Sequence, residues 1–123
     1  MKTYTDIQQS KKLAEFLSLE SADMCYCNDG TSIKIDATSY SVGVTKWKKY
    51  LVELIPCWSL AALINAIPSE IVDNHFLTLH KEGEEYCCCY ENYNGHSIKG
   101  CFSDNPIDAC YEMIVKLKEE GLI

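Results

Sequence analysis

The stretch FLTLHKEGEEYCCCYENYNGHSIKGCFS, residues 76–103, decides the fold of this chain. It holds three runs of apolar, aromatic and cysteine residues, separated by the turn formers at 82–85 and at 94–95. An Asn-Gly pair between two such runs is the strongest short signal for a tight hairpin. The stretch therefore predicts a three-stranded antiparallel meander over 76–81, 86–93 and 96–103.

The turns also predict which residues share a face of this sheet. A two-residue loop pairs Tyr93 with His96 and brings Cys88 opposite Cys101, while the first loop can have two or four residues. One face is then expected to carry Leu77, Leu79, Tyr86, Cys88, Tyr90, Lys99 and Cys101. The other is expected to carry Phe76, Thr78, His80, Cys87, Cys89, Tyr93, His96, Ile98 and Phe102. Both faces are substantially apolar, whereas a half-exposed sheet normally has one polar face.

The helix after this sheet has the clearest local signals of the chain. Asn105 is a favoured N-cap, Pro106 suits the first helical position, and Asp108 suits the positive end of the helix dipole. Apolar residues then repeat at spacings of three and four, and Gly121 can end the helix in a left-handed conformation. The sequence predicts a helix that begins at Pro106 and ends before Gly121.

Two earlier helices are expected as well. Ser59 is a good N-cap for 60–66, which are strong helix formers, and Pro68 ends this segment. A loose apolar stripe predicts a first helix over 6–19, with Thr5 as the N-cap of a capping box.

The polar region between these helices is expected to be β-rich. Alternating apolar residues predict one short strand around 33–35, a second over 40–44 and a further strand around 52–54. The whole chain, residues 1–123, is therefore expected to be a single α+β domain. It would have three helices and an antiparallel sheet that includes the C-terminal meander.

The acidic residues of this chain are unevenly distributed. Residues 1–61 hold 7 lysines and 7 acids, net 0, whereas residues 62–123 hold 4 lysines and 11 acids, net −7. Arginine, the usual bidentate partner of phosphate and guanine, is absent. The only basic cluster comprises Lys46, Lys48 and Lys49. Nucleic-acid binding is therefore not expected.

The hydropathy of the chain predicts a cytoplasmic protein without membrane contact. Its start, residues 1–6, is polar, and its most apolar stretch, 54–68, is interrupted by Pro56 and is too short to span a bilayer. In the cytoplasm thiols stay reduced.

The 8 cysteines are therefore expected to be small buried hydrophobes. Zinc sites favour pairs spaced C-x₂₋₄-C. This chain instead has a C-x-C at 25–27 and a run of three at 87–89. Adjacent strand residues face opposite sides, so Cys87 and Cys88 would not share a site. We expect no metal ligands and no cofactor, with a thiol or zinc-binding protein as an alternative.

The sequence contains no catalytic motif that we can recognise. There is no G-x-G-x-x-G, P-loop, G-x-S-x-G or H-E-x-x-H pattern. His80 and His96 share the predicted sheet face with Cys87 and Cys89, where a Cys–His nucleophile pair can be imagined. The sequence does not let us name a third group that would orient the histidine, so we expect no catalytic residues and no enzymatic activity.

The predicted sheet with two apolar faces is the feature that says most about function. Two helices can cover one face, and the other face must be covered by the N-terminal segment, be covered by a partner chain, or remain a binding patch. Tyr86, Tyr90 and Lys99 are the candidate binding residues, since tyrosine and a charge at the rim suit interfaces.

Three segments resemble a known group of proteins. They are ESADMCY at 20–26, IPCWSLAAL at 55–63 and DNPIDACYEMI at 104–114. In order and spacing they are similar to small proteins of unassigned activity carried by phages, prophages and conjugative elements of gut Bacteroidetes. The resemblance leaves residues 28–50 uncovered. It implies a mobile-element setting and assigns no functional residue.

These observations favour a non-catalytic accessory protein of a mobile element that acts through protein–protein contacts. Its partner would be an unidentified protein, with self-association left open. An acidic DNA mimic that inhibits a host nuclease is the alternative suggested by the net charge of −7 in residues 62–123.

Overall fold

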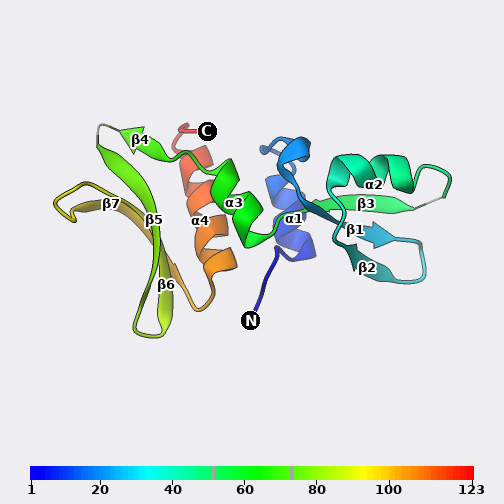
Figure 1. Ribbon diagram of the computed structural model, residues 1–123, viewed down its shortest axis with the longest axis horizontal. Helices are drawn as coiled ribbons and strands as arrows, with labels where there is room; N and C mark the ends of the chain where they lie inside the picture. Colours follow the sequence, from blue (N-terminus) through cyan, green and yellow to red (C-terminus); the bar gives the residue numbers. More distant parts are fainter. Residues whose placement is uncertain (51, 73) are drawn as a thin grey trace. The chain divides into compact units, whose positions relative to one another are not determined.

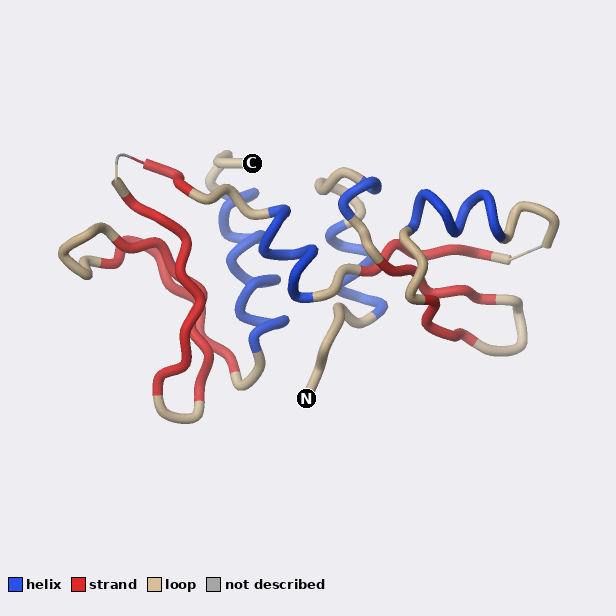
Figure 2. Tube along the Cα trace, in the orientation of Figure 1, coloured by secondary structure: helices blue, strands red, loops and turns tan. Residues whose placement is uncertain are grey.

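The computed structural model describes residues 1–50, 52–72 and 74–123, which divide into two compact units. The N-terminal unit is Thr3–Ala62, and the C-terminal unit is Leu63–Ile123 together with Met1–Lys2. Each unit has its own antiparallel sheet (Figures 1 and 2). The α+β class is confirmed, but the described residues form four α-helices instead of three. The single domain expected over 1–123 stays a prediction.

The N-terminal unit is built on a three-stranded sheet with β1 at its centre. β1 pairs antiparallel with both β2 and β3, so Cys25 lies between Asp36 and Pro56. The elements of this unit, in chain order, are α1 (Ile7–Leu13), β1 (Met24–Asn28), β2 (Ile33–Asp36), α2 (Tyr40–Lys46) and β3 (Glu53–Cys57).

The first helix is shorter than predicted and begins one residue later. Asp6 is its N-cap, because the Asp6 carboxylate accepts a hydrogen bond from the Gln9 backbone N–H at 2.8 Å. The Gln9 side chain accepts one from the Asp6 backbone N–H at 3.1 Å, which completes a capping box. α1 ends at Leu13, and a 3₁₀ turn follows at Leu19–Ser21.

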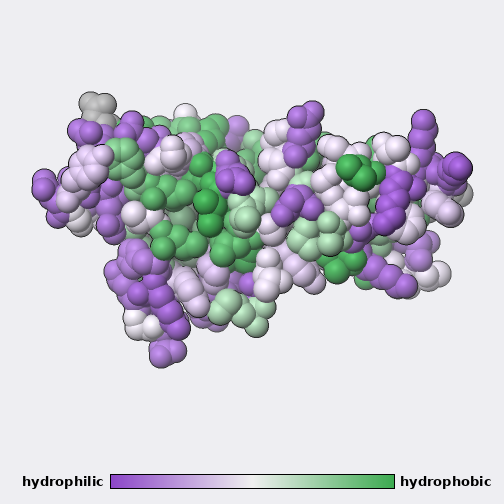
Figure 3. Space-filling view, viewed as in Figure 1, coloured by the Kyte–Doolittle hydropathy of each residue, from purple (hydrophilic) through white to green (hydrophobic). Residues whose placement is uncertain are grey.

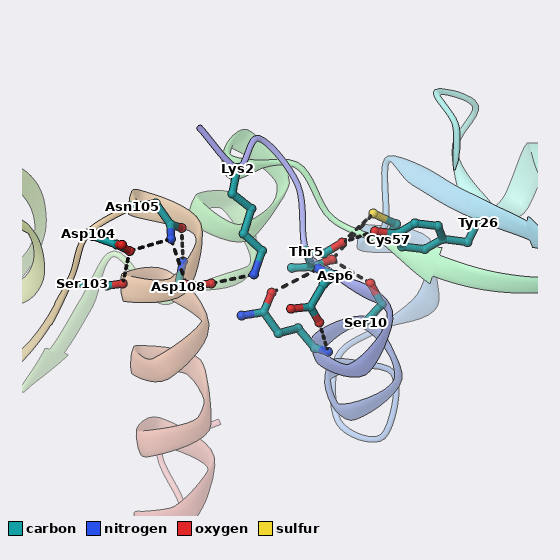
Figure 4. Close-up of polar contacts among 11 residues, drawn as sticks. Lys2, Thr5, Asp6, Ser10, Tyr26, Cys57, Ser103, Asp104, Asn105 and Asp108 are labelled. Atoms are coloured by element: carbon teal, nitrogen blue, oxygen red, sulfur yellow. Dashed lines mark hydrogen bonds and ion pairs between the residues drawn. The ribbon is translucent and has the colours of Figure 1, made fainter. Parts of the chain in front are cut away.

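Thr5, the N-cap expected from the sequence, has a different role. It is fully buried, and its hydroxyl lies 2.8 Å from the Ser10 hydroxyl and accepts a hydrogen bond from the Trp58 backbone N–H at 3.1 Å. The Tyr26 hydroxyl donates to the Thr5 carbonyl at 2.7 Å (Figure 4). Thr5 therefore connects α1 to the end of β3, which leaves the capping position to Asp6.

The segment expected as a strand over 40–44 is the helix α2. Ser39 caps it by accepting a hydrogen bond from the Val42 backbone N–H at 3.3 Å. Gly43 is buried, and a Cβ at this position would lie 3.0 Å from Cys25 Sγ on β1. Val42 and Val44, whose alternation predicts a strand, are 56% and 47% exposed. The valines thus contribute little to the core, and the small glycine allows the close approach to β1.

The helix α3, Leu60–Ala66, connects the two units along the chain. The Ser59 hydroxyl accepts a hydrogen bond from the Ala62 backbone N–H at 3.3 Å, as a capping residue does. The helix over 60–66 is therefore confirmed.

The C-terminal unit contains a four-stranded sheet in the order β4-β5-β6-β7. Each strand pairs antiparallel with the next one along the chain, and Cys88 lies opposite both Leu79 and Cys101. The first strand was not expected from the sequence. The strands are β4 (Glu70–Val72), β5 (His75–Glu82), β6 (Glu85–Glu91) and β7 (Ser97–Ser103).

The turn between β6 and β7 is wider than the expected two-residue loop. Strand pairing ends at Glu91 opposite Ser97, after an irregularity in the register. The side-chain oxygen of Asn92 closes the turn by accepting a hydrogen bond from the His96 backbone N–H at 2.9 Å. Tyr93 and His96 therefore lie in the turn and are not a strand pair.

The last helix, α4 (Pro106–Glu119), agrees with its sequence signals. The Asn105 side chain accepts a hydrogen bond from the Asp108 backbone N–H at 2.9 Å, and Lys2 Nζ lies 2.8 Å from Asp108 Oδ1 (Figure 4). Gly121 has the left-handed φ of 72° that ends the helix.

No helix among the described residues combines the length and apolar character needed to cross a membrane.

Replacing the N-cap of α4 should lower stability. Asn105→Ala removes the acceptor for the Asp108 backbone N–H, so we expect the free energy of unfolding to fall by about 1 kcal/mol in urea denaturation. Asn65→Ala, at an exposed position of α3, is the matched control and should change it by less than about 0.5 kcal/mol. Equal losses in the two variants would contradict the capping role.

The cysteines belong mainly to the two cores. All eight are free, and seven are buried, with Cys27 as the partly exposed one. In the C-terminal unit the Cys88 thiol on β6 is hydrogen-bonded to the Cys110 thiol on α4; this contact and burial raise the pKa of Cys88. The prediction of small buried hydrophobes is confirmed for these seven.

Candidate functional site

In the C-terminal unit, α4 covers one face of the sheet. It packs against β6 and β7 through the face that carries Cys88 and Cys101. Within this unit, no described helix lies on the opposite face (Figure 1). Strand register assigns that opposite side, which we call the open face, to Glu70, Phe76, Thr78, His80, Glu82, Glu85, Cys87, Cys89, Glu91, Gly100 and Phe102.

The residues expected to form the binding patch lie on the face that α4 covers. Tyr90 is fully buried, and its hydroxyl donates to the Pro68 carbonyl at 2.6 Å. Lys99 pairs with Glu120 at 2.6 Å, and its side chain is 16% exposed. The expected exposure of Tyr90 is therefore wrong, because the helix packs on this face. Binding through the half-buried Tyr86 and through Lys99 stays a prediction.

The centre of the open face is apolar. Phe102 is 49% exposed, and its ring lies 3.6 Å from where a Cβ on Gly100 would be, so the ring covers the glycine. Phe76 packs against Tyr93, with 5.2 Å between ring centroids, and Tyr93 is itself 84% exposed. Hydrophilic residues gather at the two hairpin ends of this sheet (Figure 3). The open face thus offers aromatic surface to solvent.

The charged residues of the open face are all acidic. Among the described strand residues, no lysine falls on this side, because Lys81 and Lys99 lie opposite Tyr86 and Tyr90 on the face that α4 covers. The acidic residues around the apolar centre are Glu70, Glu82, Glu85 and Glu91. This arrangement favours a positively charged ligand or partner.

A histidine and two cysteines meet at the middle of the open face. His80 on β5 is directly opposite Cys87 on β6, and Cys89 follows Cys87 by two residues on the same side. One ring nitrogen of His80 and the two Sγ atoms all lie within 4.8 Å of one another. This donor set, one imidazole and two thiols, is typical of a site for a zinc-like metal ion.

Carboxylates contact this cluster from both sides. His80 Nε2 lies 2.8 Å from Glu82 Oε1, and the Cys89 thiol donates to Glu91 Oε1 at 3.2 Å. Thr78 Oγ1 lies 2.9 Å from Cys89 Sγ. Two members of the cluster, His80 and Cys89, therefore have polar neighbours that can orient them.

The electrostatics of the cluster do not favour a cysteine nucleophile. Burial, and next the neighbouring Cys89, raise the pKa of Cys87 to about 12. Burial also raises the pKa of Cys89. A reactive cysteine needs a lowered pKa, since the thiolate is the nucleophile. His96, the other histidine expected near these thiols, lies in the exposed β6–β7 turn.

Strand alternation in the sequence places His80, Cys87 and Cys89 on one face, but the cysteine spacing predicts no metal ligands there. That expectation relied on the absence of C-x₂₋₄-C spacing, which suits turns and helix ends. In a strand, a C-x-C pair places both thiols on one side, and a histidine on the neighbouring strand can lie opposite them. The signal that was missed is the C-x-C pair Cys87 and Cys89 on one strand, together with His80 on the neighbouring strand.

The basic cluster of the N-terminal unit is partly neutralised. Lys46 Nζ lies 3.0 Å from Asp36 Oδ2, and the Trp47 ring N–H donates to the same oxygen at 3.0 Å. A hollow of about 340 Å³ nearby is lined by Tyr40, Val44, Trp47, Lys48, Tyr50, Val52 and Leu54. Its lining is mainly apolar and aromatic, which does not point to a phosphate site.

Thiol alkylation should distinguish Cys27 from the buried cysteines. Burial, and next Asp36, raise the pKa of Cys25 to about 11, so its thiolate is scarce at neutral pH. We expect iodoacetamide to modify Cys27 first in the folded protein, as followed by peptide mass spectrometry over time. Equally fast modification of Cys25 would contradict the burial described for β1.

Comparisons with protein-family models, with curated proteins and with solved structures found no match for this chain.

Proposed function

We propose that this protein is a non-catalytic accessory protein of a mobile genetic element and acts through protein–protein contacts. The observation that supports the contact role is the open face, an apolar sheet surface with half-exposed Phe102 and acidic residues around it. Exposed aromatic surface next to charged residues is typical of an interface. The mobile-element setting rests on the sequence resemblance.

The charges of the open face favour a basic partner. Residues 62–123 have a net charge of −7, and the four open-face glutamates contribute to it. A second copy of the chain would bring the same negative charges to the interface, which disfavours self-association through this face. We therefore expect a protein partner that presents apolar side chains flanked by lysine or arginine.

The alternative of a DNA mimic is less well supported. A mimic of the DNA backbone would need its carboxylates along one surface. In the C-terminal unit, exposed acids also occur on α4, at Glu112 and Glu119, across the sheet from the open-face glutamates. This distribution does not favour a single phosphate-like surface.

A substitution on the open face should abolish partner binding. Phe102→Glu adds a charge to the apolar centre, and Val42→Glu, at a 56% exposed position of α2, is the matched control. We expect a partner that co-purifies with the wild-type chain to be retained by Val42→Glu and lost with Phe102→Glu. With the purified partner, the affinity should fall as salt rises, because part of the attraction is electrostatic.

The proposal would be wrong if Phe102→Glu, folded as judged by circular dichroism, retained the same proteins as the wild-type chain. It would also be wrong if every co-purifying protein were lost equally with Val42→Glu. A nuclease as the captured partner, bound through the α4 acids and not through Phe102, would support the DNA-mimic alternative instead.

A further inference from the structure

We propose that His80, Cys87 and Cys89 bind a zinc ion on the open face of the C-terminal sheet. The three side chains come from two paired strands, so the site is held by the strand register and not by a loop. The inference does not depend on the partner proposed above, because it concerns only the donor atoms of the chain itself.

The positions of the donor atoms suit tetrahedral coordination. With zinc–sulfur and zinc–nitrogen bonds of about 2.3 and 2.0 Å, tetrahedral ligand atoms lie about 3.5–3.8 Å apart. The donor atoms of His80, Cys87 and Cys89 lie within 4.8 Å of one another. Small side-chain rotations would therefore bring them to ligand spacing without a change in backbone register.

The nitrogen and sulfur donors select zinc over the harder cations. Magnesium and calcium prefer all-oxygen sites, whereas imidazole and thiolate together suit zinc. Loading releases two thiol protons, one each from Cys87 and Cys89, and leaves a neutral unit of Zn²⁺ with two thiolates and one imidazole. The fourth position is available to water or to a carboxylate, and Glu91 is the carboxylate that already contacts Cys89.

Glu82 acts in this site as a positioning residue. Its carboxylate lies 2.8 Å from His80 Nε2; in the tautomer with the proton on Nε2, that N–H donates to Glu82 and Nδ1 keeps a free lone pair for the ion. Metal-binding histidines usually donate their second N–H to such a group, which fixes the tautomer and the ring orientation. A zinc ion bound in this way would link β5 to β6 near the hairpin at 82–85.

Cobalt and zinc titrations test the site directly. In the wild-type chain, we expect one equivalent of Co²⁺ to produce thiolate-to-cobalt charge-transfer absorption with tetrahedral visible bands, and Zn²⁺ to displace it. His80→Asn should weaken zinc affinity by on the order of 100-fold, and Glu82→Gln by about 10-fold, since loss of an outer-shell partner alone weakens affinity about 10- to 100-fold. At the same zinc concentration, zinc should also raise the melting temperature of the wild-type chain by more than that of His80→Asn.

Two controls separate a built site from general thiol binding. Cys27→Ser removes the partly exposed cysteine of the N-terminal unit and should leave the cobalt spectrum unchanged. The His80 ring belongs to a side chain that is 35% exposed, so His80→Asn should fold even if Cys87→Ser or Cys89→Ser does not. Absence of the charge-transfer band in the folded wild-type chain, or identical spectra for wild type and His80→Asn, would overturn the proposal.

Discussion

Tyr90→Ala should lower the free energy of unfolding by about 3–5 kcal/mol, as for other fully buried aromatic residues. Tyr90 has no solvent exposure and lies on the sheet face that α4 covers. The substitution leaves a cavity and removes the hydrogen bond to the Pro68 carbonyl. Tyr90→Phe keeps the ring and should lose only about 1 kcal/mol, the usual contribution of one hydrogen bond. Urea denaturation measures both values.

Phe102→Ala is the matched control on the opposite side of the same sheet. Phe102 is 49% exposed, so truncating its side chain leaves no buried cavity. The substitution should lower the free energy of unfolding by no more than about 1 kcal/mol. Equal losses for Tyr90→Ala and Phe102→Ala would mean that both sheet faces are core. The open face would then not be available to a partner.

Trp58→Ala should have an effect of similar size in the N-terminal unit, about 3–5 kcal/mol. Trp58 is fully buried, and its ring N–H donates to the Ser21 hydroxyl at 2.9 Å. Its backbone N–H also donates to Thr5 Oγ1. Thermal and urea unfolding, followed by circular dichroism, should show the loss.

Two further variants show whether this loss comes from core packing. Trp58→Phe retains most of the apolar volume and should lose about 1–2 kcal/mol, while Trp47→Ala, at a partly exposed position, should lose less than Trp58→Ala. If Trp47→Ala were as destabilising as Trp58→Ala, the core of this unit would not be centred on Trp58.

The elements that sequence reasoning identified correctly are those with local signals. Asn105 and Pro106 define the start of α4, and Ser59 precedes α3, because capping depends on residues within one helical turn. The pairing of Cys88 with Cys101 was also predicted, although from a two-residue turn that the structure does not have; the irregularity between Tyr90 and Glu91 offsets the wider turn. The helix caps need no knowledge of the rest of the chain.

The elements that sequence reasoning missed depend largely on tertiary contacts. The alternating valines of α2 favoured a strand over the local cap signal of Ser39, whereas the close packing of Gly43 on Cys25 of β1 is a tertiary contact that the pattern does not show. Thr5 does not cap α1 because its hydroxyl is hydrogen-bonded to the Ser10 hydroxyl and to the Trp58 backbone N–H. Trp58 is far from Thr5 along the chain, so the sequence near α1 does not reveal this contact. Such competition between local propensity and packing is invisible in a pattern of apolar residues.

The sequence predicted which residues of the candidate site lie together, but not which face of the sheet is open. Alternation correctly grouped His80 with Cys87 and Cys89 on one face of the sheet. It could not show which face α4 covers, because both faces are apolar and the helix packs on only one of them. The binding patch was therefore assigned to the covered face, where Tyr90 is fully buried.

Site-specific photocrosslinking tests the role of the open face most directly. A photoreactive phenylalanine analogue at position 102, on the open face, is compared with the same analogue at position 42, on α2, in cells that express each chain. We expect a crosslinked protein adduct from position 102 that is absent from position 42. Crosslinking from position 42 but not from position 102, or the same adducts from both positions, would contradict a binding role for the open face.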